Sequence, residues 1–371
     1  MPKYRITTAT TTTTTTRKEG SIESTTVHTV TKKETMALPD ESLRSLAVLG
    51  AIKGGIGFLT VMAALESGHF TGPYGVVALM RPYVTITDEQ QDRISKIEEK
   101  GGRVLRLDTS NHTETVTALR GADAVLSLML ASPKSLPAVE AFVDDCIEAG
   151  VKRFIPDVFG VDYTKNLYPC IAHWFLSSAK WFGSRNNVHD LLVSRSDKIS
   201  FTEIINGYFA DATNLQSPAL FGIDWTNMTA RFTGPAATAP VSFTFRRDAA
   251  RMVVEVLRNP AISKNRRLRV EGGRMSVDEL VALYERVSGR VFDKKILEAS
   301  ALEDAESASA AGIEGFSYMA LKGLAAVNPG GEEPVDNALF PRWRPAGMDA
   351  HAREMFELER DAVGSRERTE K

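Results

Sequence analysis

The chain has 371 residues, of which 43% are hydrophobic and 25% charged, and its formal net charge is −2. These values are typical of a soluble globular protein with enough apolar residues for one large or two ordinary domains. They argue against a general nucleic-acid binder, because the nearly neutral charge comes without a basic stripe that carries interleaved aromatic residues. No apolar run reaches the ~18–20 residues of a membrane span, so we expect no membrane partner.

The cysteine content favours a reducing compartment. Two cysteines, Cys146 and Cys170, are too few for a disulfide framework or a cysteine-rich metal site. We interpret both as buried thiols and expect no bound metal. The sequence therefore predicts a cytoplasmic protein.

The two ends of the chain differ in composition from the rest. Residues 7–16 are nearly all threonine, and the sequence up to residue 40 mixes Thr, Ser, Lys and Glu without apolar periodicity. Such a segment buries too little surface to offset its ordering entropy. We predict a disordered, threonine-rich extension over residues 1–40 and a flexible charged tail over residues 356–371.

From residue 46 the chain alternates short apolar runs with helical stretches. Strands are predicted at residues 46–49, 75–80, 103–107, 124–128, 153–155 and 200–205. Helices are predicted between them at residues 58–67, 88–100, 113–120 and 135–149. This order is typical of a doubly wound parallel sheet of the α/β class, whose ligand crevice lies at the carboxyl ends of the strands. Later elements are predicted at residues 268–270, 277–288, 292–297 and 301–324, where Ser276 and Glu279 form a capping box.

The first strand leads into a glycine-rich turn, Gly-Ala-Ile-Lys-Gly-Gly-Ile-Gly, at residues 50–57. Such a turn lets the backbone approach a pyrophosphate, which the amino end of the following helix attracts. We expect the pyrophosphate contacts at Gly50, Ala51, Gly54, Gly55, Ile56 and Gly57. The next strand ends at Arg81, where an acidic residue would bind the ribose of NAD and an arginine suits the 2′-phosphate of NADP. The sequence therefore predicts an NADP(H) site.

Other residues at the carboxyl ends of the predicted strands complete the expected cofactor site. They are Asp108, Thr109, Met129, Leu130, Asn206, Tyr208 and Phe209. Aromatic side chains at residues 174–175, 181–182 and 208–209 suit a flat apolar ligand, although some of them must belong to the core.

Several motifs together carry a family resemblance. They are the glycine-rich turn, Met80-Arg81-Pro82, Leu107-Asp108, the run Val151-Lys-Arg-Phe-Ile-Pro-Asp-Val-Phe-Gly160, and Thr202-Glu-Ile-Ile-Asn-Gly-Tyr-Phe209. In these motifs the chain resembles the NmrA-like branch of the atypical short-chain dehydrogenases, which includes isoflavone reductases and phenylcoumaran benzylic ether reductases. The resemblance spans about residues 46–355, and we expect one of the family's many fungal members. It implies a Rossmann-type NADP-binding domain at residues 41–205 and a smaller substrate-binding region at residues 206–355.

The chain departs from the family pattern in the turn. The turn at residues 50–57 is one residue longer than the family's Gly-x-x-Gly-x-x-Gly, and Lys53 stands where a small residue is expected. Lys53 points either at the cofactor phosphates or, as we favour, at solvent. Cofactor binding fails if Lys53 or the extra residue fills the pyrophosphate position.

The second departure concerns catalysis. Family reductases place a lysine about one turn before a valine, and in this chain the position falls on Arg185, before Val188. An arginine can donate to a substrate oxygen, but its pKa above ~12 rules out general acid–base work at neutral pH. Lys180 takes the lysine's role if the helix register shifts, and His189 is a further proton-donor candidate. Lys180 is otherwise a solvated lysine on the helix surface, and His189 is otherwise a structural histidine. Asp157 stands where family reductases usually carry serine, so it either adds a negative charge beside the crevice or caps the following turn.

These residues leave three functions open. The first is an NADPH-dependent reductase of a small aromatic or conjugated secondary metabolite, with hydride from the cofactor and charge stabilisation by Arg185 or Lys180. The second is a non-catalytic NADP(H) sensor with a protein partner, which loss of the lysine favours. The third is a redox-neutral isomerase or cyclase on the same fold. The sequence does not decide between a monomer and a homodimer.

Overall fold

The computed structural model describes the chain in separate ranges. They are residues 5–12, 27–34, 42–82, 85–160, 162, 176–210, 223–224, 227–233, 238, 240–297, 334–350 and 352–354. The chain divides into two compact units, residues 1–42 and 43–371. The predicted helix at 301–324, the predicted tail at 356–371 and Cys170 lie outside the described residues.

The first unit contains a pair of strands. β1 (Arg5–Thr12) pairs antiparallel with β2 (Val27–Glu34) along their whole length. The sequence predicts disorder for residues 1–40; within this range the structure describes residues 5–12 and 27–34, and there it has strands instead. The β-branched threonines and valines of both strands favour extended backbone, which the search for apolar periodicity did not take into account.

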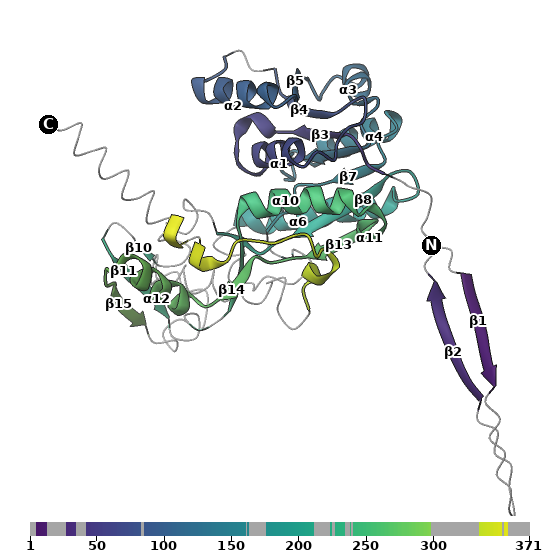
Figure 1. Cartoon of the computed structure of the whole chain (residues 1–371). Helices are drawn as coiled ribbons and strands as arrows, with labels where there is room; N and C mark the ends of the chain where they lie inside the picture. The colour runs from purple at the N-terminus through teal and green to yellow at the C-terminus, as the bar shows by residue number, and fades with distance from the viewer. Residues whose placement is uncertain are drawn as a thin grey trace, which may run out of the picture. The chain divides into compact units, whose positions relative to one another are not determined.

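The second unit is built on a seven-stranded parallel sheet in the order β13-β8-β7-β6-β3-β4-β5 (Figure 1). The strands are β3 (Leu46–Leu49), β4 (Val76–Met80), β5 (Arg103–Arg106), β6 (Ala124–Ser127), β7 (Arg153–Ile155), β8 (Ser200–Ile205) and β13 (Arg266–Arg269). The strand order reverses between the neighbours β3 and β6, which places the topological switch point there. The predicted doubly wound α/β sheet is confirmed.

Helices cover both faces of this sheet (Figure 1). One face carries α1 (Gly55–Glu66), α2 (Asp88–Glu99) and α10 (Arg246–Arg258), and the other carries α3 (His112–Leu119), α4 (Leu136–Glu148) and α6 (Leu176–Ser194). The side chains of β3 alternate between the two cores, since Leu46 and Val48 join the first and Ala47 and Leu49 the second. A strand that is buried on both faces requires this nearly continuous apolar sequence.

The C-terminal region adds two small sheets, of order β14-β12-β9 and β10-β11-β15. Their strands are β9 (Tyr208–Phe209), β10 (Ile223–Asp224), β11 (Thr229–Thr233), β12 (Val241–Thr244), β14 (Gly273–Met275) and β15 (Asp293–Leu297). The remaining elements are α11 (Pro260–Ser263), α12 (Val277–Ser288) and η3 (Asp336–Leu339). The predicted capping box of α12 is confirmed, because the Ser276 hydroxyl accepts from the Glu279 amide and the Glu279 carboxylate accepts from the Ser276 amide.

The two predicted domains of this unit interleave instead of meeting at residue 205. α10 and β13 follow the expected boundary in sequence, yet they complete the first helical layer and the parallel sheet. Phe340 and Trp343 then return to the same core. Within the described ranges, no helix combines the length and the apolar character needed to cross a membrane.

Candidate active site

A pocket of about 340 Å³ opens at the switch point, beyond the carboxyl ends of β3, β4 and β6. Its lining comprises Leu49, Gly50, Ile52, Lys53, Met80, Arg81, Leu128, Met129, Leu130, Ser132 and Ser135. Four of the predicted cofactor residues, Gly50, Arg81, Met129 and Leu130, therefore meet in one place although they come from three strand ends. The volume lies within the range of small-molecule sites, roughly 300–1,000 Å³.

The lengthened turn folds inward and leaves this pocket open. Residues Ala51–Lys53 form the 3₁₀ helix η1, with Ala51 and Ile52 buried and Lys53 exposed at the pocket wall. Gly54 has φ 93° and ψ −154°, a backbone conformation that is essentially restricted to glycine. A Cβ at Gly57 would lie 2.6 Å from Leu128 Cδ1 and 3.0 Å from Ala51 Cα, so only glycine lets the start of α1 approach the end of β6 this closely.

An arginine from α2 holds the turn in place. The Arg93 guanidinium donates to the Ile52 carbonyl at 3.1 Å and pairs with Glu89 one turn earlier on its own helix. It also packs on Gly54, where a Cβ would lie 2.8 Å from the guanidinium carbon. Arg93 thus fixes the 3₁₀ conformation that accommodates the extra residue.

Replacing Arg93 by glutamine is expected to loosen the turn. A hydrogen bond from a charged donor is worth about 1.5–3 kcal/mol, so amide exchange at residues 51–54 should accelerate by about tenfold or more. Hydrogen–deuterium exchange with mass spectrometry measures this. Lys96→Gln is the matched control, because Lys96 makes a comparable i,i+4 ion pair with Asp92 at 2.7 Å on the same helix. Equal exchange in Arg93→Gln and wild type would contradict the assigned role.

Two further predicted cofactor residues make bonds within the protein. The exposed Asp108 carboxylate accepts from the amide and the hydroxyl of Ser110, and these hydrogen bonds lower its pKa. The buried Asn206 accepts from the Gly160 amide at 2.9 Å and so joins the loops that follow β7 and β8. Neither Asp108 nor its neighbour Thr109 lines the described pocket. Cofactor contacts by these three residues stay predictions.

The aromatic pair of β9 lies beside the parallel sheet. Tyr208 packs edge-on against Phe243, and burial raises the pKa of its hydroxyl. The Arg246 guanidinium lies 5.4 Å from the centre of the Phe209 ring. Both aromatic side chains are half-buried, and their contact with a ligand stays a prediction. The aromatic side chains expected at residues 174–175 and 181–182 lie outside the described ones.

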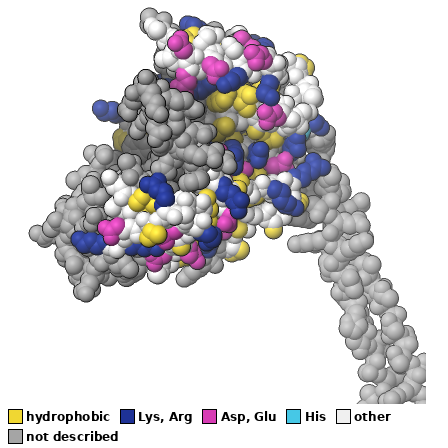
Figure 2. Space-filling model, turned by 60° about the vertical axis from the view of Figure 1, so that its left-hand side comes forward, with side chains coloured by type: hydrophobic (Ala, Val, Ile, Leu, Met, Phe, Trp, Pro, Cys, Tyr) yellow, Lys and Arg dark blue, Asp and Glu magenta, His cyan; other side chains and the backbone are white. Residues whose placement is uncertain are grey.

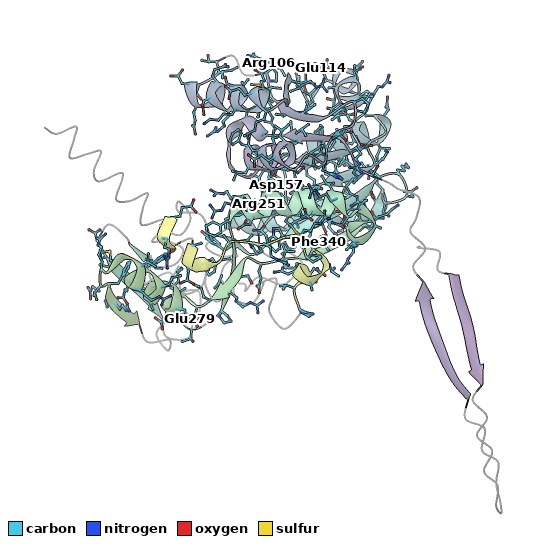
Figure 3. All side chains as sticks on the ribbon, in the orientation of Figure 1. Arg106, Glu114, Asp157, Arg251, Glu279 and Phe340 are labelled. Carbon is cyan, nitrogen blue, oxygen red and sulfur yellow. The ribbon has the colours of Figure 1, made fainter. Side chains whose placement is uncertain are left out.

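The residue at the lysine position faces an unexpected partner. Arg185 on α6 is buried and donates to the Phe159 carbonyl at 3.1 Å. Asp157, which follows β7 (Figure 3), interacts electrostatically with it. Burial raises the pKa of the Asp157 carboxyl while Arg185 opposes the rise, and burial lowers the pKa of Arg185 while Asp157 opposes the fall. The resemblance implies a serine and a lysine at these two positions, where this chain has an aspartate and an arginine.

Asp157 gives stability a specific pH dependence. Its folded pKa is raised, so its contribution is present below the unfolded value of about 3.9 and is lost as the pH rises through the folded value. The free energy of unfolding of Asp157→Asn, relative to wild type, should therefore increase as the pH rises from about 4 through the folded pKa, by about 1.4 kcal/mol for each pH unit that separates the two pKa values. Urea denaturation across this range measures it. Asp108→Asn is the control: the folded pKa of Asp108 is lowered, so its difference should stay flat. A flat profile for Asp157→Asn would overturn the expectation.

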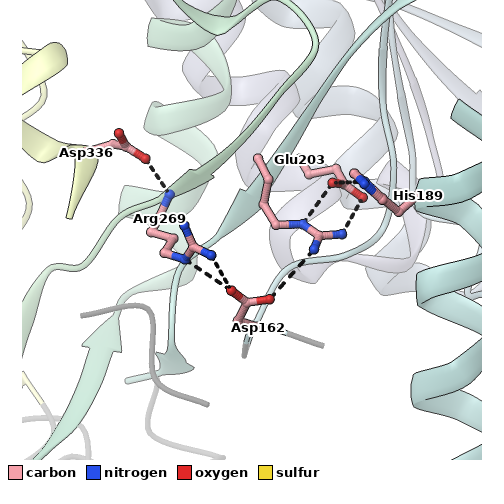
Figure 4. Close-up of polar contacts among 6 residues, drawn as sticks. Asp162, His189, Glu203, Arg269 and Asp336 are labelled. Carbon is pink, nitrogen blue, oxygen red and sulfur yellow. Dashed lines mark hydrogen bonds and ion pairs between the residues drawn. The ribbon is translucent and has the colours of Figure 1, made fainter. Parts of the chain in front are cut away.

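His189 belongs to a buried ionic network (Figure 4). Its Nδ1 lies 2.8 Å from the Glu203 carboxylate, which Arg267 also binds at 2.9 Å. Arg269 and Asp162 extend the network with a 2.9 Å ion pair. These contacts favour a structural role for His189. Its role as a proton donor stays a prediction that the mechanism proposed below does not use. Lys180 lies on α6, and its side chain is outside the described ones.

Sequence reasoning missed the serines of the pocket wall. Ser132 and Ser135 each accept from the other's amide, at 2.9 and 3.2 Å, and the Ser135 hydroxyl donates to the Leu130 carbonyl at 2.5 Å. They hold the loop between β6 and α4 against the pocket. The signal was a Ser-Pro-Lys-Ser segment directly before a predicted helix, where serine commonly caps.

Comparisons with known proteins agree with this geometry. The chain matches the model of the NmrA-like family over residues 44–322. It is 23% identical to Pinoresinol reductase 2 of Arabidopsis thaliana over 84% of this chain and 96% of that one. It is 28% identical to Oxidoreductase poxI of Penicillium oxalicum over 70% of this chain and 79% of that one. The solved structure of AtPrR2 with NADP+ and (+)pinoresinol has a TM-score of 0.67 and 21% identity, with 84% of this chain and 98% of that one covered. The structural likeness shows the shared fold.

Proposed function

This chain belongs to the NmrA-like family, and from that premise we propose that it is an NADPH-dependent reductase of a small aromatic or conjugated secondary metabolite. Relatives named pinoresinol reductase and oxidoreductase support an oxidoreductase. A structural neighbour that holds NADP+ and pinoresinol supports both the cofactor and the substrate class. The pocket at the switch point is the observation within this chain that carries the proposal.

The pocket lining suits NADPH in its charges and in its open backbone. Arg81 and Lys53 place two cations at the wall next to the glycine-rich turn, where a 2′-phosphate and a pyrophosphate need them. Met129 and Leu130 provide an apolar surface on the β6 side. When bound, the cofactor supplies the hydride.

The chain's own contribution to catalysis is positioning and charge. Arg185 is fixed by the Phe159 carbonyl, and we assign to it the stabilisation of negative charge on a substrate oxygen. It transfers no proton at neutral pH, because an arginine keeps its charge. Asp157 interacts electrostatically with Arg185. Lys180 stays the alternative donor on the same helix.

Titration calorimetry with NADP+, NADPH, NAD+ and NADH tests the cofactor part of the proposal. We expect the phosphorylated pair to bind at least tenfold more tightly than the other two. Oxidation of NADPH in the presence of phenolic and conjugated carbonyl compounds, followed at 340 nm, then tests the reaction. Absence of binding by all four dinucleotides would refute the proposal.

A cofactor sensor is the second candidate, and Arg185 is the observation that favours it. A buried arginine held by Phe159 keeps a charge at the lysine position without its acid–base chemistry. A sensor would bind NADPH but would not oxidise it, whichever compound is added. It would capture a protein partner only in the presence of cofactor. A redox-neutral isomerase or cyclase would instead convert a substrate without net NADPH oxidation.

A further inference from the structure

A second cavity of about 340 Å³ lies at the far end of α1 from the glycine-rich turn. Its lining comprises Ala63, Glu66, Ser67, Arg251, Val254, Glu255, Arg258, Arg342, Trp343 and Arg344. α1 has 12 residues and is about 18 Å long at ~1.5 Å per residue, so the cavity is separate from the pocket at its amino end. No comparison assigns a role to this place.

The lining carries an excess of positive charge. Both of its carboxylates are matched by a cation: Glu66 pairs with Lys100 at 3.2 Å, and Glu255 pairs with Arg258 at 3.3 Å. Arg342 and Arg344 have no acidic partner among the described residues. Basic side chains are numerous across the middle of the face that Figure 2 shows.

Arg251 adds to this excess from α10 (Figure 3). Its closest acidic contact is Asp248 at 3.4 Å, and its side chain is 60% exposed. Arg258 lines the cavity as well, and its guanidinium is engaged by Glu255 and the Ser67 carbonyl. The cavity therefore offers guanidinium donors for which this part of the chain supplies too few acceptors.

The walls of the cavity are fixed before any ligand arrives. Arg258 donates to the Ser67 carbonyl at 2.7 Å and so ties α10 to the end of α1. The Trp343 indole donates to the Asp248 carbonyl at 2.9 Å, and the Ala346 amide donates to the Asp248 carboxylate at 2.8 Å. These bonds hold the segment that carries Arg342 and Arg344 against α10. Preformed walls reduce the ordering cost of binding.

We propose that this cavity binds a small polyanion, a molecule with two or more phosphate or carboxylate groups. Guanidinium groups bind both kinds of oxyanion with paired, charge-assisted hydrogen bonds. Pyrophosphate and citrate are small molecules of the two kinds and serve as the probes for this cavity. This site does not depend on the proposed reductase function.

Calorimetric titration with sodium pyrophosphate and with sodium citrate tests the site. We expect at least one of them to bind to the wild type, and the one that binds more tightly identifies the group that is recognised. The double variant Arg342→Gln/Arg344→Gln should lose about tenfold or more of that affinity. Binding should also weaken as the salt concentration rises.

The cofactor pocket is the competing site for an anion, and a second variant separates the two. Arg81→Gln should leave the affinity for the polyanion unchanged. If the affinity falls in Arg81→Gln and persists in the double variant, the anion binds at the cofactor pocket and the proposal is wrong. Absence of binding by both anions to the wild type is equally decisive against it. An unchanged melting temperature shows that the double variant is folded. If the double variant does not fold, Arg251→Gln takes its place in the titration.

Discussion

Arg81→Asp is expected to weaken NADPH binding by about a hundredfold or more and to leave NADH binding within a few fold of wild type. Arg81 follows β4 and lines the pocket, where an arginine suits a 2′-phosphate. The substitution removes a charge-assisted hydrogen bond, worth about 1.5–3 kcal/mol, and adds a repulsive carboxylate. The ratio of the two dissociation constants, measured by calorimetry, isolates the effect on the phosphate.

Arg106→Asp is the matched control for this change. Arg106 ends β5, the strand beside β4, and it does not line the described pocket (Figure 3). The two variants share the same net charge, so a general electrostatic effect would weaken NADPH binding in both. Equal losses would refute a specific role for Arg81. If neither variant loses affinity, the phosphate is held elsewhere, and Lys53 becomes the residue to replace.

The sheet could be predicted because its signals are local. A strand such as β3 is apolar on both faces, and capping residues such as Ser276 mark where helices begin. The pocket could be expected at the carboxyl ends of the strands, because ligands of doubly wound parallel sheets bind there in general. These features need no knowledge of contacts between distant segments.

The support of the pocket could not be predicted, because it depends on such contacts. Arg93 reaches the Ile52 carbonyl from 41 residues away, and this bond determines how the lengthened turn is accommodated. The pairing of Asp157 with Arg185 also joins a strand end to a helix that follows later in the chain. In sequence the lengthened turn, Asp157 and Arg185 stood only as departures from the family pattern, whereas the structure shows which residues contact them.

Arg153, in the most specific motif of the chain, is another residue whose contacts with distant segments could not be predicted from the sequence. The run at residues 151–160 indicates the family, but its spacing gives no role to the arginine. In the structure Arg153 is 1% exposed and crosses from β7 to β8 and α11. It donates to the hydroxyls of Ser200, Thr202 and Ser263 at 2.8, 2.8 and 2.7 Å, and to the Pro260 carbonyl at 2.9 Å. The motif therefore encodes a connection within the fold.

Arg153→Ala should accordingly lower the free energy of unfolding by about 3–5 kcal/mol. The change removes a large buried side chain and leaves three hydroxyls and a carbonyl short of a donor. Arg153→Lys should fall between alanine and wild type, because an ammonium group lacks the planar fork that reaches several acceptors. Urea denaturation measures both variants.

Lys152→Ala provides the control from the adjacent position. Lys152 is 56% exposed and pairs with Asp123 at 2.6 Å, and an exposed ion pair of this kind is worth at most about 1 kcal/mol. The two neighbouring cations of this motif are thus expected to differ severalfold in their effect on the free energy of unfolding, since Arg153 is buried and Lys152 faces water. Similar losses for Arg153→Ala and Lys152→Ala would show that the buried hydrogen bonds are not what makes Arg153 important. The feature that makes the run at residues 151–160 distinctive would then be the loop at Asp157.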